Sequence, residues 1–430
     1  MNSIAIAILL GSFFLMIFLG VHISYAMIAS SIFTFFYLQL SPVQIISSLV
    51  GGIDGFTFLA IPFFILSGDI MSSGGISDRL IKFADACVGW MRGGMAMVNI
   101  LASVFFGGIS GSATADTASL GAILIPMMEK QGYDAEFSTS VTMTSSVEGM
   151  LIPPSHNMII YAMAAGGVSV SALFMAGIVP GITLAIALMI YSFILSVKRN
   201  YPKGKPFSFH YFLETLGHSI WGLGTVLIVV FGVVTGRFTP TESAAIACIY
   251  AIIVSIFVYR EMHWKDLIPT CKKSLKVLST VLILIAASGP FGFCITYLGI
   301  PKMVVAGLLG VTSSKFLLLL LINLIILVLG MILGMASIII IVTPILMPVL
   351  LSLGYSPIQF GIVLILNCGI GLITPPVGGV LFIGSGLSGL SIERLTKCTF
   401  PFLIVMFVVL MLITYIPAFS LALPTALGLI

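Results

Sequence analysis

The chain has 430 residues, of which 59% are apolar and only 7% are charged, and its formal net charge is +4. A soluble domain of this length could not cover its surface with so few charged side chains. The composition therefore excludes an ordinary soluble enzyme, gives no support to nucleic-acid binding, and predicts an all-α polytopic membrane protein.

Charged residues are missing from three long stretches. None precedes Asp54, none lies between Lys315 and Glu393, and none follows Lys397. The middle stretch alone has room for about three spans of about 20 residues each. The N-terminal apolar run lacks the basic region and the cleavage site of a signal peptide, so we expect it to remain in the membrane.

In chain order, apolar segments alternate with short interruptions. The first half has two candidate spans near 4–38 and further candidates at 42–74, 93–128, 136–165 and 169–197. Three of these are interrupted, at 60–62, 107–117 and 153–154. A central hairpin is expected at 216–259, and the second half has candidates at 274–298, 302–312, 316–350, 357–386 and 399–423.

Basic residues gather in two loops that flank the central hairpin. The loops contain Lys198, Arg199, Lys203 and Lys205, and then Arg260, Lys265, Lys272, Lys273 and Lys276. By the positive-inside rule both loops face the cytoplasm, and the hairpin turn at 237–242 faces outward.

A proline pair occurs twice, as Pro153-Pro154 and Pro375-Pro376, and we call the separation of Pro153 from Pro375 the repeat offset. The same offset relates two further prolines, two Gly-Tyr pairs and two glycines: Pro126 and Pro348, Gly132-Tyr133 and Gly354-Tyr355, Gly149 and Gly371. We therefore expect one transmembrane transporter domain over 1–430 with two pseudo-symmetric repeats, 1–197 and 274–430. The basic loops and the hairpin occupy 198–273 between them. The sequence leaves open whether the repeats are inverted or parallel.

Three segments concentrate small and polar residues at membrane depth, at 107–117, 145–157 and 367–379. Irregular backbone is tolerated there only where it is buried in protein or lines a wet cavity. A broken helix leaves carbonyl groups that suit a dehydrated Na⁺ and N–H groups that suit a carboxylate. Paired broken helices are typical of the substrate and ion sites of secondary transporters. For any single glycine, close helix packing is the alternative.

Polar side chains near these breaks are the candidate ligands. Asp116 and Glu148 are the nearest carboxylates, and ionisable residues inside a membrane are usually functional, although Asp116 could instead cap a helix. His156 and Asn157 follow the first proline pair where Gly378 and Gly379 follow the second. This asymmetry predicts that the first half contacts an asymmetric substrate; a satisfied core histidine is the alternative for His156. We expect substrate contacts from Thr114, Asp116, Thr117, Ser155, His156 and Asn157.

Several of these motifs resemble those of a known family. They are Ile61-Pro-Phe-Phe-Ile-Leu-Ser-Gly68, Ser110-Gly-Ser-Ala-Thr-Ala-Asp116-Thr117, Ile152-Pro-Pro-Ser155, Leu173-Phe-Met-Ala-Gly177 and Gly371-Leu-Ile-Thr-Pro-Pro376. Together they resemble the large membrane subunit of tripartite ATP-independent periplasmic (TRAP) transporters, the DctM-like family. The resemblance covers nearly the whole chain.

The resemblance implies an elevator-type, Na⁺-coupled importer of an organic acid, such as a C4-dicarboxylate or sialic acid, in the bacterial inner membrane. It implies two helical hairpins and two broken helices. Two partners are also implied: a small four-helix membrane subunit (DctQ-like) and a soluble periplasmic binding protein (DctP-like). Na⁺ is the only cofactor expected.

Carried over by position, the resemblance places a Na⁺ site at Ser110, Ser112, Gly149, Pro153, Gly330, Gly334, Gly371 and Thr374. Many members have an acidic residue where this chain has Gly334, which bears on the number of coupling ions. A stand-alone Na⁺/dicarboxylate symporter that needs no binding protein, and a channel-like membrane protein, are the alternatives. No Walker loop is present in the sequence to indicate ATP hydrolysis.

Overall fold

The protein is described by a computed structural model that covers residues 2–51, 53–312 and 314–430. These residues are mostly helical and contain no β-strand, apart from one isolated bridge between Arg92 and Lys203. The first ten α-helices are α1 (Ser3–Phe18), α2 (Ile23–Tyr37), α3 (Pro42–Gly51), α4 (Ala60–Ser73), α5 (Ile76–Val88), α6 (Gly94–Ser110), α7 (Ala113–Lys130), α8 (Ala135–Glu148), α9 (His156–Ala164) and α10 (Val170–Lys198). The others are α11 (Phe209–Val234), α12 (Pro240–Ile253), α13 (Trp264–Tyr297), α14 (Ile300–Val311), α15 (Lys315–Gly330), α16 (Met335–Ser352), α17 (Pro357–Leu372), α18 (Gly379–Ser388), α19 (Ile392–Tyr415) and α20 (Ala418–Ala426).

Six helical segments of the described chain are long and apolar enough to cross a membrane: α10, α11, α12 with its π-helical extension to Val258, α13, α16 and α19. The pair α4 and α5 is a further candidate, bent by 72° between its two helices. The expected multi-pass membrane protein is confirmed.

The helix bounds recur along the chain at the repeat offset. This offset separates both the first and the last residues of α7 and α16, and it separates the first residues of α8 and α17 and of α10 and α19. Since the offset found from prolines and glycines also relates whole helices, the two pseudo-symmetric repeats are present in the fold.

Ion pairs near the start of α8 show how the repeats are oriented. Asp134 precedes α8 and pairs at 2.8 Å with Arg199, which follows the end of α10. Glu136 in the first turn of α8 pairs with Arg394 in the first turn of α19. The end of α10 and the start of its counterpart α19 therefore lie on the same side of the molecule. The repeats are inverted, a question that the sequence left open.

The helix is interrupted within the expected break at 107–117, but the prediction that 93–128 forms one broken span is wrong. Asn99 in α6 donates its side-chain N–H to the sulfur of Met128 in α7 at 3.6 Å, although 29 residues separate them. A continuous helix would place residues so far apart at a distance of about 44 Å. α6 and α7 thus form a hairpin whose tip is Gly111 and Ser112. α15 and α16 occupy the corresponding positions in the second repeat and are joined by 331–334.

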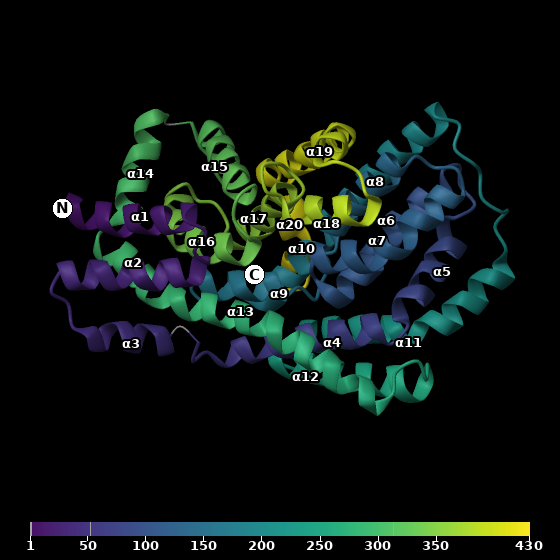
Figure 1. Ribbon diagram of the computed structural model, residues 1–430, viewed down its shortest axis with the longest axis horizontal. Helices are drawn as coiled ribbons and strands as arrows, with labels where there is room; N and C mark the ends of the chain where they lie inside the picture. Colours follow the sequence, from purple (N-terminus) through teal and green to yellow (C-terminus); the bar gives the residue numbers. More distant parts are fainter. Residues whose placement is uncertain (1, 52, 313) are drawn as a thin grey trace.

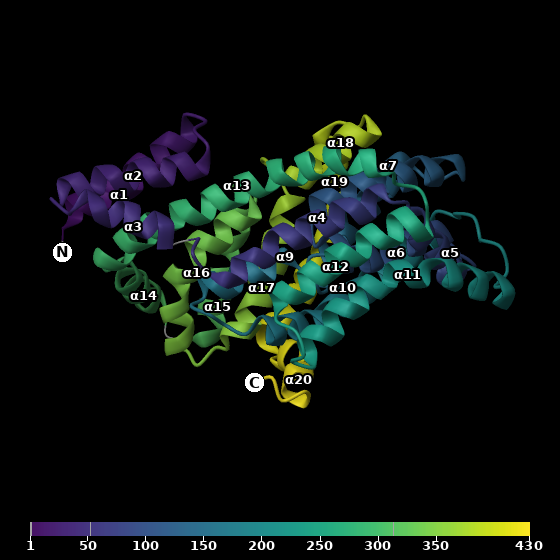
Figure 2. The same cartoon turned by 90° about the horizontal axis from the view of Figure 1, so that it is seen from below.

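The molecule is elongated, with α1, α2, α3 and α14 at one end and α5 with the start of α11 at the other, as both views show (Figure 1 and Figure 2). The two repeats interlock near the middle. α9 of the first repeat packs on α16 of the second, and α18 of the second packs on α7 and α8 of the first. Each broken-helix stub therefore lies against the hairpin of the other half.

Candidate transport site

The tip of the first hairpin contacts the chain just after the first proline pair. α6 ends at Ser110 and is followed by the capping residue Gly111, whose φ of +59° is a left-handed conformation that favours glycine. Asn157 donates its side-chain N–H to the carbonyl oxygen of Gly111 at 3.1 Å. His156 lines the same cavity as Ser110 and Ser112. The structure thus brings four predicted residues, Ser110, Ser112, His156 and Asn157, to one place.

The proline pairs explain why a helix stops at this place in each repeat. Proline has no N–H to continue a helical ladder, and it disfavours a helical conformation in the residue before it. α8 accordingly ends at Glu148 and α17 at Leu372, a few residues before each pair, and both Pro-Pro bonds are cis. The chain resumes as α9 and α18, so both predicted helix breaks are confirmed.

Glycines let the hairpin approach the broken helix in both repeats. A Cβ atom at Gly107 would lie 2.1 Å from the Cα of Gly149. In the second repeat, a Cβ atom at Gly371 would lie 2.5 Å from the carbonyl carbon of Gly330. Because such distances leave no room for a side chain, Gly107 and Gly371 accept only glycine without a shift of the backbone. A Cβ atom at Gly149 or at Gly330 would lie 2.8 or 3.2 Å from the Cα of the opposite glycine, so both of these contacts are also tight.

The second tip is made of backbone rather than side chains. The N–H groups of Val377 and Gly378 both donate to the carbonyl oxygen of Met331, at 3.1 and 3.3 Å. Thr374 donates its hydroxyl to the carbonyl of Ile370 at 2.7 Å, which leaves the lone pairs of its oxygen available. Gly334 is the N-cap residue of α16, and a Cβ atom there would have no neighbour within 4 Å.

The residues at both tips suit a hard cation such as Na⁺, which prefers oxygen ligands. At the first tip, Ser112 caps α7, and its hydroxyl lies 2.9 Å from that of Thr114. Ser155 is buried, and its hydroxyl has no hydrogen-bond partner among the described residues. Backbone carbonyls, hydroxyl oxygens and glycines that permit close approach are therefore gathered at the predicted positions.

An open cavity of about 290 Å³ lies beside the first hairpin tip. Ser110, Ser112, Thr114 and His156 are the predicted residues that line it. Its wall also includes residues that the sequence reasoning missed, among them Gly68, Asp69, Ser72, Ser119 and Lys273. The remaining predicted substrate residues, Asp116, Thr117, Ser155 and Asn157, do not belong to this wall and are buried behind it.

An ion pair in this cavity joins two distant parts of the chain. The ammonium group of Lys273 in α13 lies 2.7 Å from the carboxylate of Asp69 in α4, which also accepts a 2.7 Å hydrogen bond from Ser274. The sequence analysis places Lys273 in a cytoplasmic loop, whereas the structure places it inside α13. One feature of the sequence indicates that Asp69 has a special environment: it is a charged residue inside the apolar run from Ile61 to Met71.

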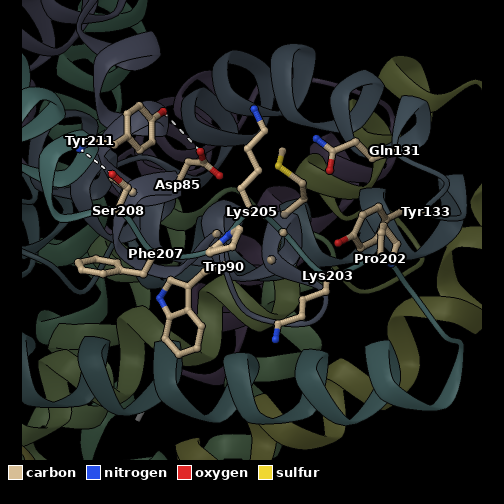
Figure 3. A pocket seen from close by; sticks show the side chains of 16 residues that line it. Asp85, Trp90, Gln131, Tyr133, Pro202, Lys203, Lys205, Phe207, Ser208 and Tyr211 are labelled. Atoms are coloured by element: carbon tan, nitrogen blue, oxygen red, sulfur yellow. Dashed lines mark hydrogen bonds between the residues drawn. The ribbon is translucent and has the colours of Figure 1, made fainter.

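A larger cavity of about 630 Å³ lies at the basic loops and contains none of the predicted site residues. Figure 3 shows Lys203 and Lys205 in its wall, with Asp85 accepting a hydrogen bond from Tyr211 at 3.4 Å. Near this cavity, Tyr201 donates its hydroxyl to Asp134. Burial, together with this hydrogen bond, raises the pKa of Tyr201 to about 12.

Inverted repeats, a hairpin tip and a broken helix in each repeat, and oxygen-lined breaks define an all-α membrane protein with the architecture of a transporter. The solved structure of the YdaH transporter from Alcanivorax borkumensis supports this fold with a TM-score of 0.64 at 17% identity, covering 86% of this chain and 87% of that one.

The family model of the tripartite ATP-independent periplasmic transporter, DctM component, matches residues 10–419, so the chain belongs to this family of large permease subunits. The C4-dicarboxylate TRAP transporter large permease protein DctM of Pseudomonas aeruginosa is 39% identical, with 87% of this chain and 88% of that protein covered. YgiK of Salmonella typhimurium, whose function is uncharacterized, is 40% identical over 98% of this chain and 97% of its own length.

Proposed function

We propose that the chain imports an organic acid together with Na⁺ across the bacterial inner membrane, by an elevator-type movement of its hairpins and broken helices. The observation that carries the proposal is the meeting of each hairpin tip with a broken helix through a glycine contact. This arrangement is the kind that holds a dehydrated ion between backbone carbonyls and exposes helix N-termini to an anion.

The cavity beside the first tip supports an anionic substrate. Lys273 provides a cation at its wall, while Ser110, Ser112 and Thr114 provide hydroxyl groups. Lys273 is already paired with Asp69, so an entering carboxylate would share or replace that partner. A C4-dicarboxylate or a similar carboxylate, as named for the Pseudomonas aeruginosa relative, is the substrate class we propose.

We further propose two partners, a small four-helix membrane subunit and a periplasmic binding protein that delivers the substrate. Members of the family are one component of a tripartite transporter, which supports the presence of two further subunits. No step of ATP hydrolysis is needed, because the Na⁺ gradient supplies the free energy.

Reconstitution in proteoliposomes tests the proposal. The chain alone should show negligible uptake of radiolabelled organic acids, while addition of the small subunit and the loaded binding protein should produce uptake driven by an inward Na⁺ gradient. A choline gradient is the matched control. Robust Na⁺-driven uptake by the chain alone would instead indicate a stand-alone symporter, and flux that ignores the Na⁺ gradient would indicate a channel-like protein.

The ion pair in the cavity offers a second test. Lys273→Gln should raise the substrate concentration needed for half-maximal uptake and leave the Na⁺ dependence unchanged. Lys276→Gln, in the same helix outside the cavity wall, is the control. Equal substrate dependence in both variants would remove Lys273 from the substrate path.

A further inference from the structure

Two carboxyl groups are buried together behind the first hairpin tip. Asp116 lies in the first turn of α7 and Glu148 is the last residue of α8, and both are 0% exposed. One oxygen of Asp116 lies 3.4 Å from the position of a Cβ atom on Gly149, the residue next to Glu148. α7 and α8 pack against each other, which brings the two carboxyl groups to the same buried region.

These carboxyl groups lack the partners that buried charges require. Ser103 donates a 3.3 Å hydrogen bond to one oxygen of Asp116. The other oxygen of Asp116 and both oxygens of Glu148 have no hydrogen-bond partner among the described residues. None of the ion pairs of the described chain involves either residue. Three buried oxygen atoms are thus available to a ligand.

The second repeat shows that the fold does not need this pair. At the repeat offset, Ile338 stands in place of Asp116 and Ile370 in place of Glu148, in helices α16 and α17 that match α7 and α8. Both isoleucines are buried. Because apolar side chains fill the same positions in an otherwise corresponding arrangement, the carboxyl pair is not required for packing.

The physical chemistry of the pair favours a cation. Burying a carboxylate without compensation is costly, and removing two charges from water together is more so. Glu148 lies at the C-terminal end of α8, where the helix dipole further disfavours a negative charge and attracts a positive one. Unpartnered carboxylate oxygens are ligands suited to a hard cation.

We propose that Asp116 and Glu148 form a Na⁺-binding site behind the first hairpin tip, additional to the ion positions proposed at the tips themselves. Ion binding there would tie α7 to the end of α8 at the helix break. The proposal shares the identity of the coupling ion with the proposed function but rests on different residues from the hydroxyl and glycine ligands of the tips.

Equilibrium binding of radioactive Na⁺ to the purified full-length chain in detergent tests this proposal, with choline chloride holding the ionic strength constant. We expect Glu148→Gln and Asp116→Asn each to bind one Na⁺ fewer per chain than the parent. Glu129→Gln is the matched control, because Glu129 is an exposed carboxylate on the same helix α7. It should bind as many ions as the parent.

A double variant separates ion binding from folding. Asp116→Ile with Glu148→Ile installs the residues of the second repeat, so this protein should fold and should unfold at a higher temperature than the parent in Na⁺-free buffer. The double variant should also bind one Na⁺ fewer than the parent. If the single variants fail to fold, the Na⁺ stoichiometry of the double variant tests the carboxyl site in their place. Parental Na⁺ stoichiometry in the folded variants would overturn the carboxyl site.

The outcomes also distinguish this proposal from the proposed function. A parent chain that binds no Na⁺ would contradict Na⁺ coupling as a whole. A parent that binds Na⁺ and keeps its stoichiometry in the carboxyl variants, while Ser112→Ala loses an ion, would contradict the carboxyl site alone.

Discussion

Gly371→Ala tests the contact that closes the second hairpin tip on its broken helix. The added Cβ atom would lie 2.5 Å from the carbonyl carbon and 2.6 Å from the Cα of Gly330, whereas ordinary contact begins near 3.4 Å. The two backbones would therefore have to separate by about 1 Å, and such overpacking typically costs about 1–3 kcal/mol. Alanine is otherwise favoured over glycine inside a helix by about 0.5–1 kcal/mol. Because the cost of the close contact exceeds the gain from alanine, we expect Gly371→Ala to lower the free energy of unfolding.

Thermal unfolding of the purified protein, with and without Na⁺, measures this effect. Gly292→Ala is the matched control, because Gly292 lies inside α13 and has no neighbour within 4 Å of a Cβ atom. The control should unfold at the parental temperature or above it. Gly371→Ala should unfold earlier and should respond more weakly to Na⁺, since the separated tip no longer holds its carbonyls in place. A Gly371→Ala protein as stable as the control would refute the close contact.

Three other substitutions test the ligands around the breaks. Thr374→Val removes an oxygen and should weaken the apparent Na⁺ affinity about tenfold for each 1.4 kcal/mol lost. The control Thr396→Val breaks a similar hydrogen bond within α19 and should leave the Na⁺ affinity unchanged. Equal Na⁺ dependence in both variants would exclude Thr374 from the Na⁺ site. Asn157→Ala leaves the carbonyl of Gly111 without its partner and should lower the free energy of unfolding by about 1–3 kcal/mol, so parental stability would contradict the role of Asn157 in holding the tip. Ser155→Ala deletes a buried hydroxyl that has no hydrogen-bond partner among the described residues. The free energy of unfolding should therefore stay the same or increase, while substrate uptake falls. Normal uptake would place the substrate site nearer Thr114.

The sequence by itself determined the class of the protein and the positions of its helix breaks. The scarcity of charge required a bilayer, because no water-exposed surface could be built from so few polar side chains. The proline pairs stopped α8 and α17, because an absent N–H and a restricted preceding residue act locally and in any tertiary setting. The repeat offset predicted a duplication that the bounds of α7 and α16 confirm.

The tertiary structure decided everything that depends on contacts between distant residues. Periodicity and composition look alike in a broken span and in a hairpin, and only the approach of Asn99 to Met128 distinguishes them. The inversion of the repeats follows from ion pairs that join α8 to α10 and α19. Likewise, the Lys273–Asp69 pair links residues that are far apart in the chain, and the burial of Asp116 with Glu148 requires α7 to fold back against α8. Local residue preferences carry no information on such pairings, because the energy that selects them arises only when the helices pack together.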